Sequence, residues 1–224
     1  MEEDELDPGF ADRFDPVSRG PCQLYLISPE RIGDDFGERL KAALDGGPVA
    51  AFQLRLKGLD DHAIARVAGP LQAICAERDV AFIVNDSIGL AKRLGADGVH
   101  LGQEDGDPRE ARELLGASAQ IGVTCHDSRH LAMEAGEKGA DYVAFGAFFP
   151  TATKETRHRP EPSILGWWSR LFEIPCVAIG GVTPENGRAL VEAGADFLAV
   201  CNAVWGHPEG PAAAVAAFQG ILER

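Results

Sequence analysis

The stretches "GADGVHLG" (95–102), "GADYVAFG" (139–146) and "GADFLAVC" (194–201) repeat one pattern along the chain. Each Gly-Ala-Asp follows a segment of helical period and leads into a short apolar run that is typical of a β-strand. The same connection from helix to strand is therefore used three times. Repeated connections of this kind indicate βα units and a parallel sheet.

Five further apolar runs have the same character. The predicted strands are residues 22–28, 49–55, 81–85, 98–101, 119–123, 142–146, 176–180 and 197–201. Helical periodicity is found between them, for example in 60–78, 108–116 and 186–194. Eight such units without a linker favour an α/β fold, a (β/α)₈ TIM barrel over residues 21–224. An open doubly wound sheet is the alternative, although no G-x-G-x-x-G follows any predicted strand.

The composition excludes several classes of protein. A net charge of -14 argues against a nucleic-acid partner. No apolar run approaches the roughly 18 residues of a membrane span, and the acidic start lacks the order of a signal peptide. We expect a cytoplasmic protein without a membrane partner, in which residues 1–20 form a flexible acidic tail. A homo-oligomer stays compatible with the sequence.

The five cysteines are far apart and include no C-x-x-C pair. An odd number of separated cysteines indicates neither a zinc site nor a disulfide framework. We therefore expect small buried thiols.

The stretch "QLRLK" (53–57) ends the second predicted strand. Because side chains alternate along a strand, Gln53, Arg55 and Lys57 share one face, whereas Leu54 and Leu56 share the other. Active sites of (β/α)₈ barrels lie at the C-terminal ends of the strands. We expect the amide and the two cations to face the site, and Leu56 to point away from it at a strand end that solvent reaches.

Acidic side chains follow the next two predicted strands. Asp86 comes directly after Asn85, and Glu104 and Asp105 lie in the loop after residues 98–101. Two carboxylates without a His or Cys cluster suit Mg²⁺, which completes its shell with water and phosphate oxygens. A solvated loop charge or a helix cap is the alternative for each acid, and Asp86 is a candidate cap.

Phosphate-binding residue types follow the sixth and seventh predicted strands. Thr151, Thr153 and Lys154 offer hydroxyls and an ammonium, and Gly180 and Gly181 would let backbone N–H groups approach an anion. A solvated loop and ordinary turn glycines are the alternatives. Together with Arg55, Lys57 and a divalent cation, these groups exceed the needs of one phosphate. We expect one substrate with a pyrophosphate and another with a monophosphate.

The motifs "QLRLK", "VND", "HLGQED", "GVTCH", "PTATK" and "AIGGVTPEN" occur in this order. From about residue 22 to the C-terminus the chain resembles the thiamine phosphate synthase family. The resemblance implies a transferase on a (β/α)₈ barrel. It would use Mg²⁺ to join a hydroxymethylpyrimidine pyrophosphate to a thiazole phosphate, releasing pyrophosphate and forming thiamine phosphate.

The resemblance also implies roles for matched positions. The pyrimidine pyrophosphate would be bound by Gln53, Leu54, Arg55, Leu56, Lys57, Asn85, Thr124 and Lys154. The thiazole phosphate would be bound by Thr151, Ala152, Thr153, Gly181, Cys201 and Asn202. The ligands of Mg²⁺ would be Asp86 and Asp105. The catalytic residues would be Arg55, Lys57 and Lys154, which would stabilise the departing pyrophosphate while the pyrimidine carries a carbocation.

Three positions depart from the family pattern. The family commonly has an acid at Leu56, a serine at Thr124 and a serine at Asn202. The hydroxyl of Thr124 keeps the serine contact, and Asn202 is tolerable if the contact there is a backbone N–H.

Two other functions stay open at this point. A thiazole tautomerase on the same barrel would use His126 as its proton carrier and would not need the pyrophosphate-binding residues. A non-catalytic protein that binds thiamine precursors would bind substrates without forming product.

Overall fold

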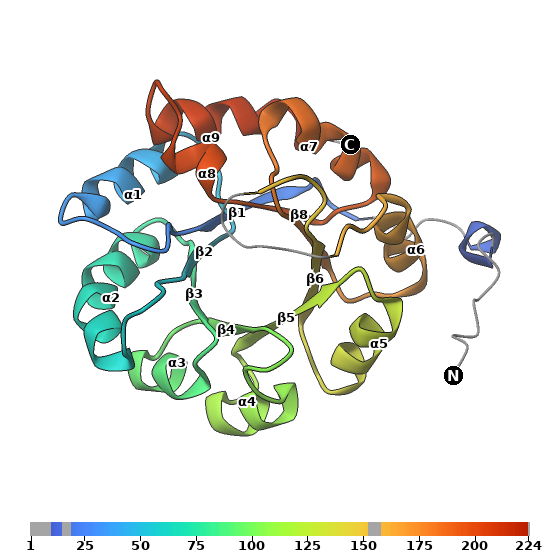
Figure 1. Cartoon of the computed structure of the whole chain (residues 1–224), viewed down its shortest axis with the longest axis horizontal. Helices are drawn as coiled ribbons and strands as arrows, with labels where there is room; N and C mark the ends of the chain where they lie inside the picture. Colours follow the sequence, from blue (N-terminus) through green and yellow to red (C-terminus); the bar gives the residue numbers. More distant parts are fainter. Residues whose placement is uncertain (1–9, 15–18, 152–157, 224) are drawn as a thin grey trace.

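The computed structural model describes residues 10–14, 19–151 and 158–223. Eight parallel strands close into a barrel in sequence order, with β1 paired to β8, and helices form an outer ring (Figure 1). The strands are β1 (Gln23–Ile27), β2 (Ala51–Leu54), β3 (Ala81–Asn85), β4 (Gly98–Leu101), β5 (Gln120–His126), β6 (Tyr142–Gly146), β7 (Cys176–Ile179) and β8 (Phe197–Val200). The predicted (β/α)₈ barrel is confirmed.

The helices follow the strands around the ring. They are η1 (Phe10–Arg13), α1 (Phe36–Asp45), α2 (Asp61–Ala76), α3 (Ile88–Leu94), α4 (Pro108–Leu115), α5 (Arg129–Glu137), α6 (Ser163–Leu171), α7 (Pro184–Ala193), α8 (Asn202–Trp205) and α9 (Pro211–Gln219). In the described ranges, no helix has both the length and the apolar character that crossing a membrane would require.

Short polar side chains fix where several helices begin. Asp60 accepts a hydrogen bond from Ala63 N at 2.8 Å, and Ser87 accepts one from Leu90 N at 3.1 Å. Each cap satisfies a backbone N–H that the first turn leaves without a partner. Ser87, and not Asp86, therefore caps α3, so the capping alternative for Asp86 is wrong.

Most predicted strand boundaries agree with the structure to within two residues. The exception is β5, which was expected to end at residue 123 and continues to His126. Its pairing with β6 shifts register between Thr124 and His126, so one extra residue bulges from the ladder. A bulge interrupts the alternation of side chains that marks a strand in the sequence. For that reason residues 124–126 were not predicted as part of the strand.

The strand alternation separates two environments. Leu54 and Leu56 pack in the outer cluster between sheet and helices, whereas Tyr25, Tyr142 and other inward residues form a smaller cluster inside the barrel. The predicted direction of Leu56 is confirmed. Its predicted contact with solvent is wrong, because Leu56 is only 7% exposed. The helices cover this strand end, so an acid here would be buried among apolar side chains.

The three repeated Gly-Ala-Asp stretches have a common structural role. Each aspartate side chain accepts a hydrogen bond from a backbone N–H at the start of the preceding strand, which is β3, β5 or β7. The pairs are Asp97 with Phe82 N at 2.7 Å, Asp141 with Ile121 N at 2.7 Å and Asp196 with Cys176 N at 2.9 Å. Each aspartate N–H donates back to the carbonyl of the same residue. The repeat thus joins neighbouring strands at the N-terminal end of the barrel.

Part of the predicted tail contacts the barrel. Ala11 is buried, and Arg19 donates to Asp196 at 2.6 Å and to the carbonyl of Phe172. Residues 1–9 and 15–18 lie outside the described residues, so a flexible tail stays a prediction for them. Arg19, two residues before the predicted start of the barrel domain at residue 21, thus contacts the barrel.

We expect the Asp196→Ala protein to lose about 3 kcal/mol of unfolding free energy, measured by urea denaturation. The Arg19 and Asp196 side chains are only 9% and 12% exposed, and removing Asp196 leaves a nearly buried guanidinium and the Cys176 N–H without their partner. The control is Glu192→Ala, which removes an exposed ion pair with Arg188 and should cost less than about 1 kcal/mol. Equal losses would contradict this role for Asp196.

Candidate active site

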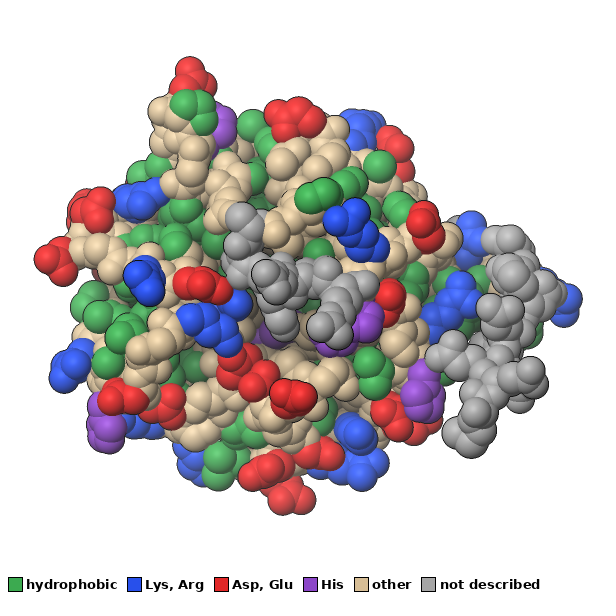
Figure 2. All heavy atoms as spheres, viewed as in Figure 1, with side chains coloured by type: hydrophobic (Ala, Val, Ile, Leu, Met, Phe, Trp, Pro, Cys, Tyr) green, Lys and Arg blue, Asp and Glu red, His purple; other side chains and the backbone are tan. Residues whose placement is uncertain are grey.

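Charged side chains meet where the second, third and fourth strands end. Arg55 and Lys57 follow β2, Asp86 follows β3, and Asp105 lies in the loop after β4. Figure 2 shows basic and acidic side chains next to each other near the middle of this face. Of the stretch "QLRLK", Lys57 is the residue that lies beside the two acids, whereas Arg55 pairs with Glu30.

Lys57 and the two acids form one electrostatic group. Lys57 Nζ lies 2.7 Å from Asp86 Oδ2, and Asp105 Oδ2 accepts a hydrogen bond from Gly102 N at 3.0 Å. Partial burial, and then the hydrogen bond and charge of Asp86, raise the pKa of Asp105, while Gly102 N and Lys57 lower it. Two carboxylates this close repel each other when both are ionised. A cation between them would relieve that repulsion.

The donor set fits a magnesium ion. The described ranges contain no group of three or more His, Cys, Asp or Glu side chains arranged for a metal. Two carboxylates are nevertheless sufficient for Mg²⁺, which keeps several waters and binds substrate phosphate oxygens. The backbone holds Asp86 in place, since its φ is 67° and its N–H donates to His100 O at 2.8 Å.

Arg55 lies at the junction of β2 with β1 and β8. Its Nη1 is 2.9 Å from Glu30 Oε1, and its backbone N–H donates to the buried Ser28 hydroxyl at 2.8 Å. The guanidinium is also near the Cys201 thiol, whose pKa burial raises to about 11 against the opposing effect of Arg55. The raised pKa favours the neutral form of this thiol. Cys201 is half-buried, whereas the other four cysteines are buried as expected.

The loop after β7 packs closely against the loop after β6. Gly181 has a φ of 65°, and a Cβ there would lie 2.4 Å from the carbonyl oxygen of Pro150. Only glycine fits this contact. The backbone of Gly181 thus lies beside the segment that leads to Thr151. The close contact explains the need for glycine here, and the predicted phosphate contact of Gly181 stays a prediction.

The remaining residues predicted for the thiazole phosphate have different outcomes. Cys201 precedes α8 and Asn202 begins it, so the first N–H groups of α8 are not used within the helix. Thr151 is half-buried. Ala152, Thr153 and Lys154 lie outside the described residues, so their predicted roles stay predictions.

Tyr25, His100 and Tyr142 lie inside the barrel and were not among the residues predicted from the sequence. Gln53 Nε2 donates to Tyr25 Oη at 3.1 Å, and Thr124 Oγ1 lies 2.8 Å from His100 Nε2. Tyr142 joins Tyr25 to His100. His100 and Tyr142 are the large polar side chains among the inward-facing positions of the fourth and sixth predicted strands. Side-chain alternation along these strands could therefore have predicted their place inside the barrel.

His126 ends β5 with a φ of 56° and stacks on His158 at a ring distance of 4.6 Å. His158 Nδ1 is in turn 2.9 Å from Asp127 Oδ1. The histidine that a tautomerase would use as its proton carrier is therefore part of a ring pair that ties β5 to the segment before α6.

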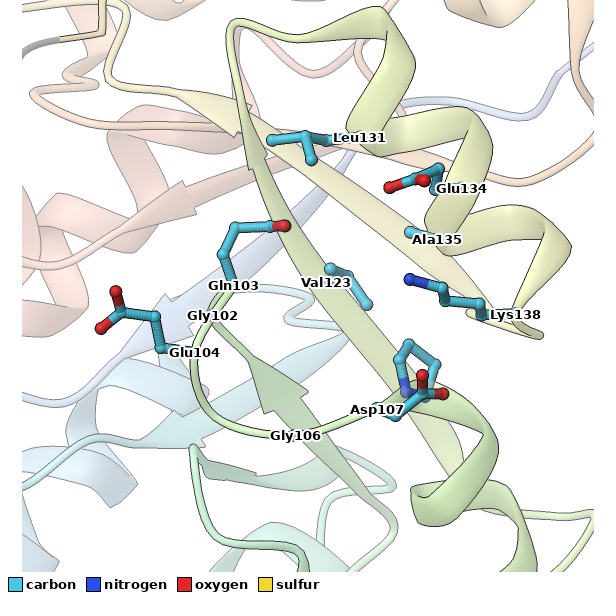
Figure 3. A pocket seen from close by; sticks show the side chains of 11 residues that line it. Gly102, Gln103, Glu104, Gly106, Asp107, Val123, Leu131, Glu134, Ala135 and Lys138 are labelled. Carbon is cyan, nitrogen blue, oxygen red and sulfur yellow. The ribbon is translucent and has the colours of Figure 1, made fainter.

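A cavity of about 330 Å³ lies outside the barrel, between the loop after β4 and α5. Figure 3 shows Glu134 on α5 and Lys138 directly after this helix at the edge of the cavity, while Glu104 points away from the helix. Its floor includes Val123, which packs in the outer cluster. The cavity lies between the loop after β4 and the outer helices, and none of the predicted substrate residues lines it.

Comparison with known proteins shows the family of this chain. The sequence profile described as thiamine monophosphate synthase matches residues 24–204. A thiamine-phosphate synthase of Erythrobacter litoralis is 66% identical over 88% of this chain and 94% of that relative, and one of Rhodospirillum centenum is 60% identical over 90% and 98%. The solved thiamine phosphate pyrophosphorylase from Pyrococcus furiosus superposes with a TM-score of 0.78 at 33% identity, covering 89% of this chain and 95% of that one. This chain belongs to the thiamine monophosphate synthase family.

Proposed function

We propose that this enzyme joins 4-amino-2-methyl-5-(diphosphooxymethyl)pyrimidine to a thiazole phosphate, forming thiamine phosphate and pyrophosphate. The observation that carries the proposal is the group of Lys57, Asp86 and Asp105 beside Arg55 at the C-terminal end of the barrel. Two cations and two adjacent acids suit a pyrophosphate that arrives with a divalent cation. An isomerase acting on one monophosphate has no use for this combination.

The pyrophosphate would lie against Arg55 and Lys57, with Asp86 and Asp105 as the ligands of Mg²⁺. The bound cation would neutralise charge on the leaving pyrophosphate. Lys57 pairs with Asp86 in the structure. With Asp86 as a ligand of a bound cation, the Lys57 ammonium would be available for a phosphate oxygen. Arg55 is held by Glu30 and by its backbone contact with Ser28, so its guanidinium is fixed before substrate binds.

The reaction needs stabilisation of charge more than a side-chain nucleophile. As the bond between the pyrimidine methylene and the pyrophosphate breaks, negative charge grows on the phosphate oxygens facing Arg55 and Lys57. Arg55, whose position is fixed before substrate binds, would lower the energy of that state without moving. The electron-rich pyrimidine carries the positive charge, and the thiazole nitrogen attacks the methylene. Positioning of the two substrates supplies the remaining acceleration.

The thiazole phosphate would bind on the opposite side of the mouth, near the loops after β6, β7 and β8. The loops after the seventh and eighth strands of such barrels often bind phosphate. The close contact of Gly181 with Pro150 and the start of α8 at Asn202 would provide backbone N–H groups. Asn202 in place of serine is acceptable in this arrangement, because the backbone makes the contact.

The direct test is incubation of the purified protein with both substrates and Mg²⁺, with thiamine phosphate and pyrophosphate measured by chromatography. We expect the two products in equal amounts. Conversion of the thiazole substrate alone would support the tautomerase instead. Calorimetric binding of substrates without product would support a non-catalytic binding protein.

Lys57→Ala should lower turnover by about two to three orders of magnitude at saturating substrates, because one charge aimed at the leaving group is lost. The control Lys41→Ala removes an exposed lysine of α1 and should leave turnover unchanged. The Lys57–Asp86 pair is partly exposed, so the melting temperature should change little. Near-normal turnover of Lys57→Ala would show that "QLRLK" is not aimed at the leaving group.

Asp105→Asn should raise the Mg²⁺ concentration needed for half-maximal activity by about tenfold or more, since one of two carboxylate ligands becomes neutral. Binding of thiazole phosphate, measured by calorimetry, should change less than about twofold. The control Glu104→Gln alters the neighbouring acid, which points away from α5 (Figure 3). An equal effect of the two substitutions on the Mg²⁺ requirement would contradict the assignment of Asp105.

A further inference from the structure

The interior of the barrel contains a continuous row of hydrogen-bonded side chains. Gln53 Nε2 donates to Tyr25 Oη at 3.1 Å, and the Tyr25 and Tyr142 hydroxyls are 2.9 Å apart. Tyr142 Oη is 3.1 Å from His100 Nδ1, and His100 Nε2 is 2.8 Å from Thr124 Oγ1. The row therefore connects β2 with β5 through β1, β6 and β4. Its two ends are both residues that we assign to the pyrimidine pyrophosphate.

Four members of this row are buried, and its two tyrosines keep their protons. Gln53 and Tyr25 are each 3% exposed, and Tyr142 and His100 are each 7% exposed. Burial raises the pKa of both tyrosines well above the usual range, so each hydroxyl keeps its proton. The Tyr25 and Tyr142 rings meet edge to face, and His100 stacks on Tyr142. Ring packing thus limits each side chain to one orientation.

The donor and the acceptor of each hydrogen bond in the row follow from the hydrogens that Gln53, the two tyrosines and His100 carry. An amide N–H of Gln53 donates to Tyr25, so the proton of Tyr25 is directed to Tyr142. The proton of Tyr142 then goes to Nδ1 of His100, which must be the unprotonated nitrogen. Nε2 of a neutral His100 consequently carries the hydrogen and donates to Thr124 Oγ1.

The opposite direction is less favourable. If Tyr142 donated to Tyr25, the Tyr25 oxygen would accept two hydrogen bonds and its own proton would need another acceptor. Gln53 and Tyr142 are its only hydrogen-bond partners in the described part of the chain. A buried hydroxyl proton without an acceptor is costly.

We propose that His100, Tyr142 and Tyr25 are positioning residues that make the Thr124 hydroxyl a hydrogen-bond donor toward an acceptor atom of the pyrimidine pyrophosphate. Because Thr124 accepts from His100, its own proton is directed to the substrate. The site would then select a substrate that offers a lone pair at this point and reject one that offers an N–H or O–H. This inference rests on the proposed function, but its first test does not.

The first test is the tautomer of His100 in the substrate-free enzyme, measured by ¹⁵N NMR of histidine-labelled protein. Loss of a signal in His100→Asn assigns the resonance. We expect neutral His100 with the hydrogen on Nε2 and an unprotonated Nδ1. A hydrogen on Nδ1, or a charged imidazolium, would overturn the proposed direction. The measurement decides this even if the protein makes no thiamine phosphate.

The second test compares Tyr142→Phe with Tyr25→Phe, which each remove one buried hydroxyl and keep the ring. Without the Tyr142 hydroxyl, Nδ1 of His100 loses the donor that keeps this nitrogen unprotonated, whereas in Tyr25→Phe the Tyr142 hydroxyl can still donate to Nδ1. We expect kcat/KM for the pyrimidine pyrophosphate to fall about tenfold in Tyr142→Phe and less than about threefold in Tyr25→Phe. The two melting temperatures should fall by similar amounts.

The tautomer signal separates positioning from a loss of packing. We expect the ¹⁵N signals of His100 to change in Tyr142→Phe and to keep the Nε2–H pattern in Tyr25→Phe. The KM for thiazole phosphate should stay the same in both variants. Equal losses of kcat/KM, or an unchanged His100 tautomer in Tyr142→Phe, would show that the row only stabilises the barrel, and the inference would be wrong.

Discussion

Alternation of side chains along a closed, parallel barrel strand is the constraint on which the rest of this structure depends. Leu54 and Leu56 must lie under the helices, so Gln53 and Arg55 on the same strand must face the interior and the mouth. A shift of one residue would exchange the two sets and bury charge in the outer core. The strand pairs of β2 with β1 and β3 hold this register. Fold and site are thus fixed by the same pattern.

The two ends of the barrel have different roles: contacts at the N-terminal end stabilise the fold, and the proposed reaction takes place at the C-terminal end. At the N-terminal end, Asp97, Asp141 and Asp196 each join two neighbouring strands through paired backbone contacts. At the C-terminal end, Asp86 and Asp105 approach each other although their charges repel. All three acids at the first end accept from backbone N–H groups, and Asp141 and Asp196 also accept from Arg112 and Arg19. At the second end Lys57 pairs with Asp86, and we propose that these two acids bind a cation together with the substrate.

The sequence predicted the barrel, its strand order and the convergence of Lys57 with the acids, because these follow from local periodicity and from where parallel strands end. It did not predict the burial of Leu56, since helix coverage of a strand end depends on tertiary packing. The row from Gln53 to Thr124 was also missed. Which inward side chains of five different strands meet depends on the stagger of the closed sheet, and no single strand contains that information.

The measurement that tests the central claim most directly is the position of a divalent cation in a crystal. Crystals grown with Mn²⁺ and pyrophosphate would locate the cation by its anomalous scattering. We expect one Mn²⁺ coordinated by carboxylate oxygens of Asp86 and Asp105, with the pyrophosphate between the cation and the side chains of Arg55 and Lys57. A cation bound elsewhere, or a pyrophosphate away from these cations, would contradict it.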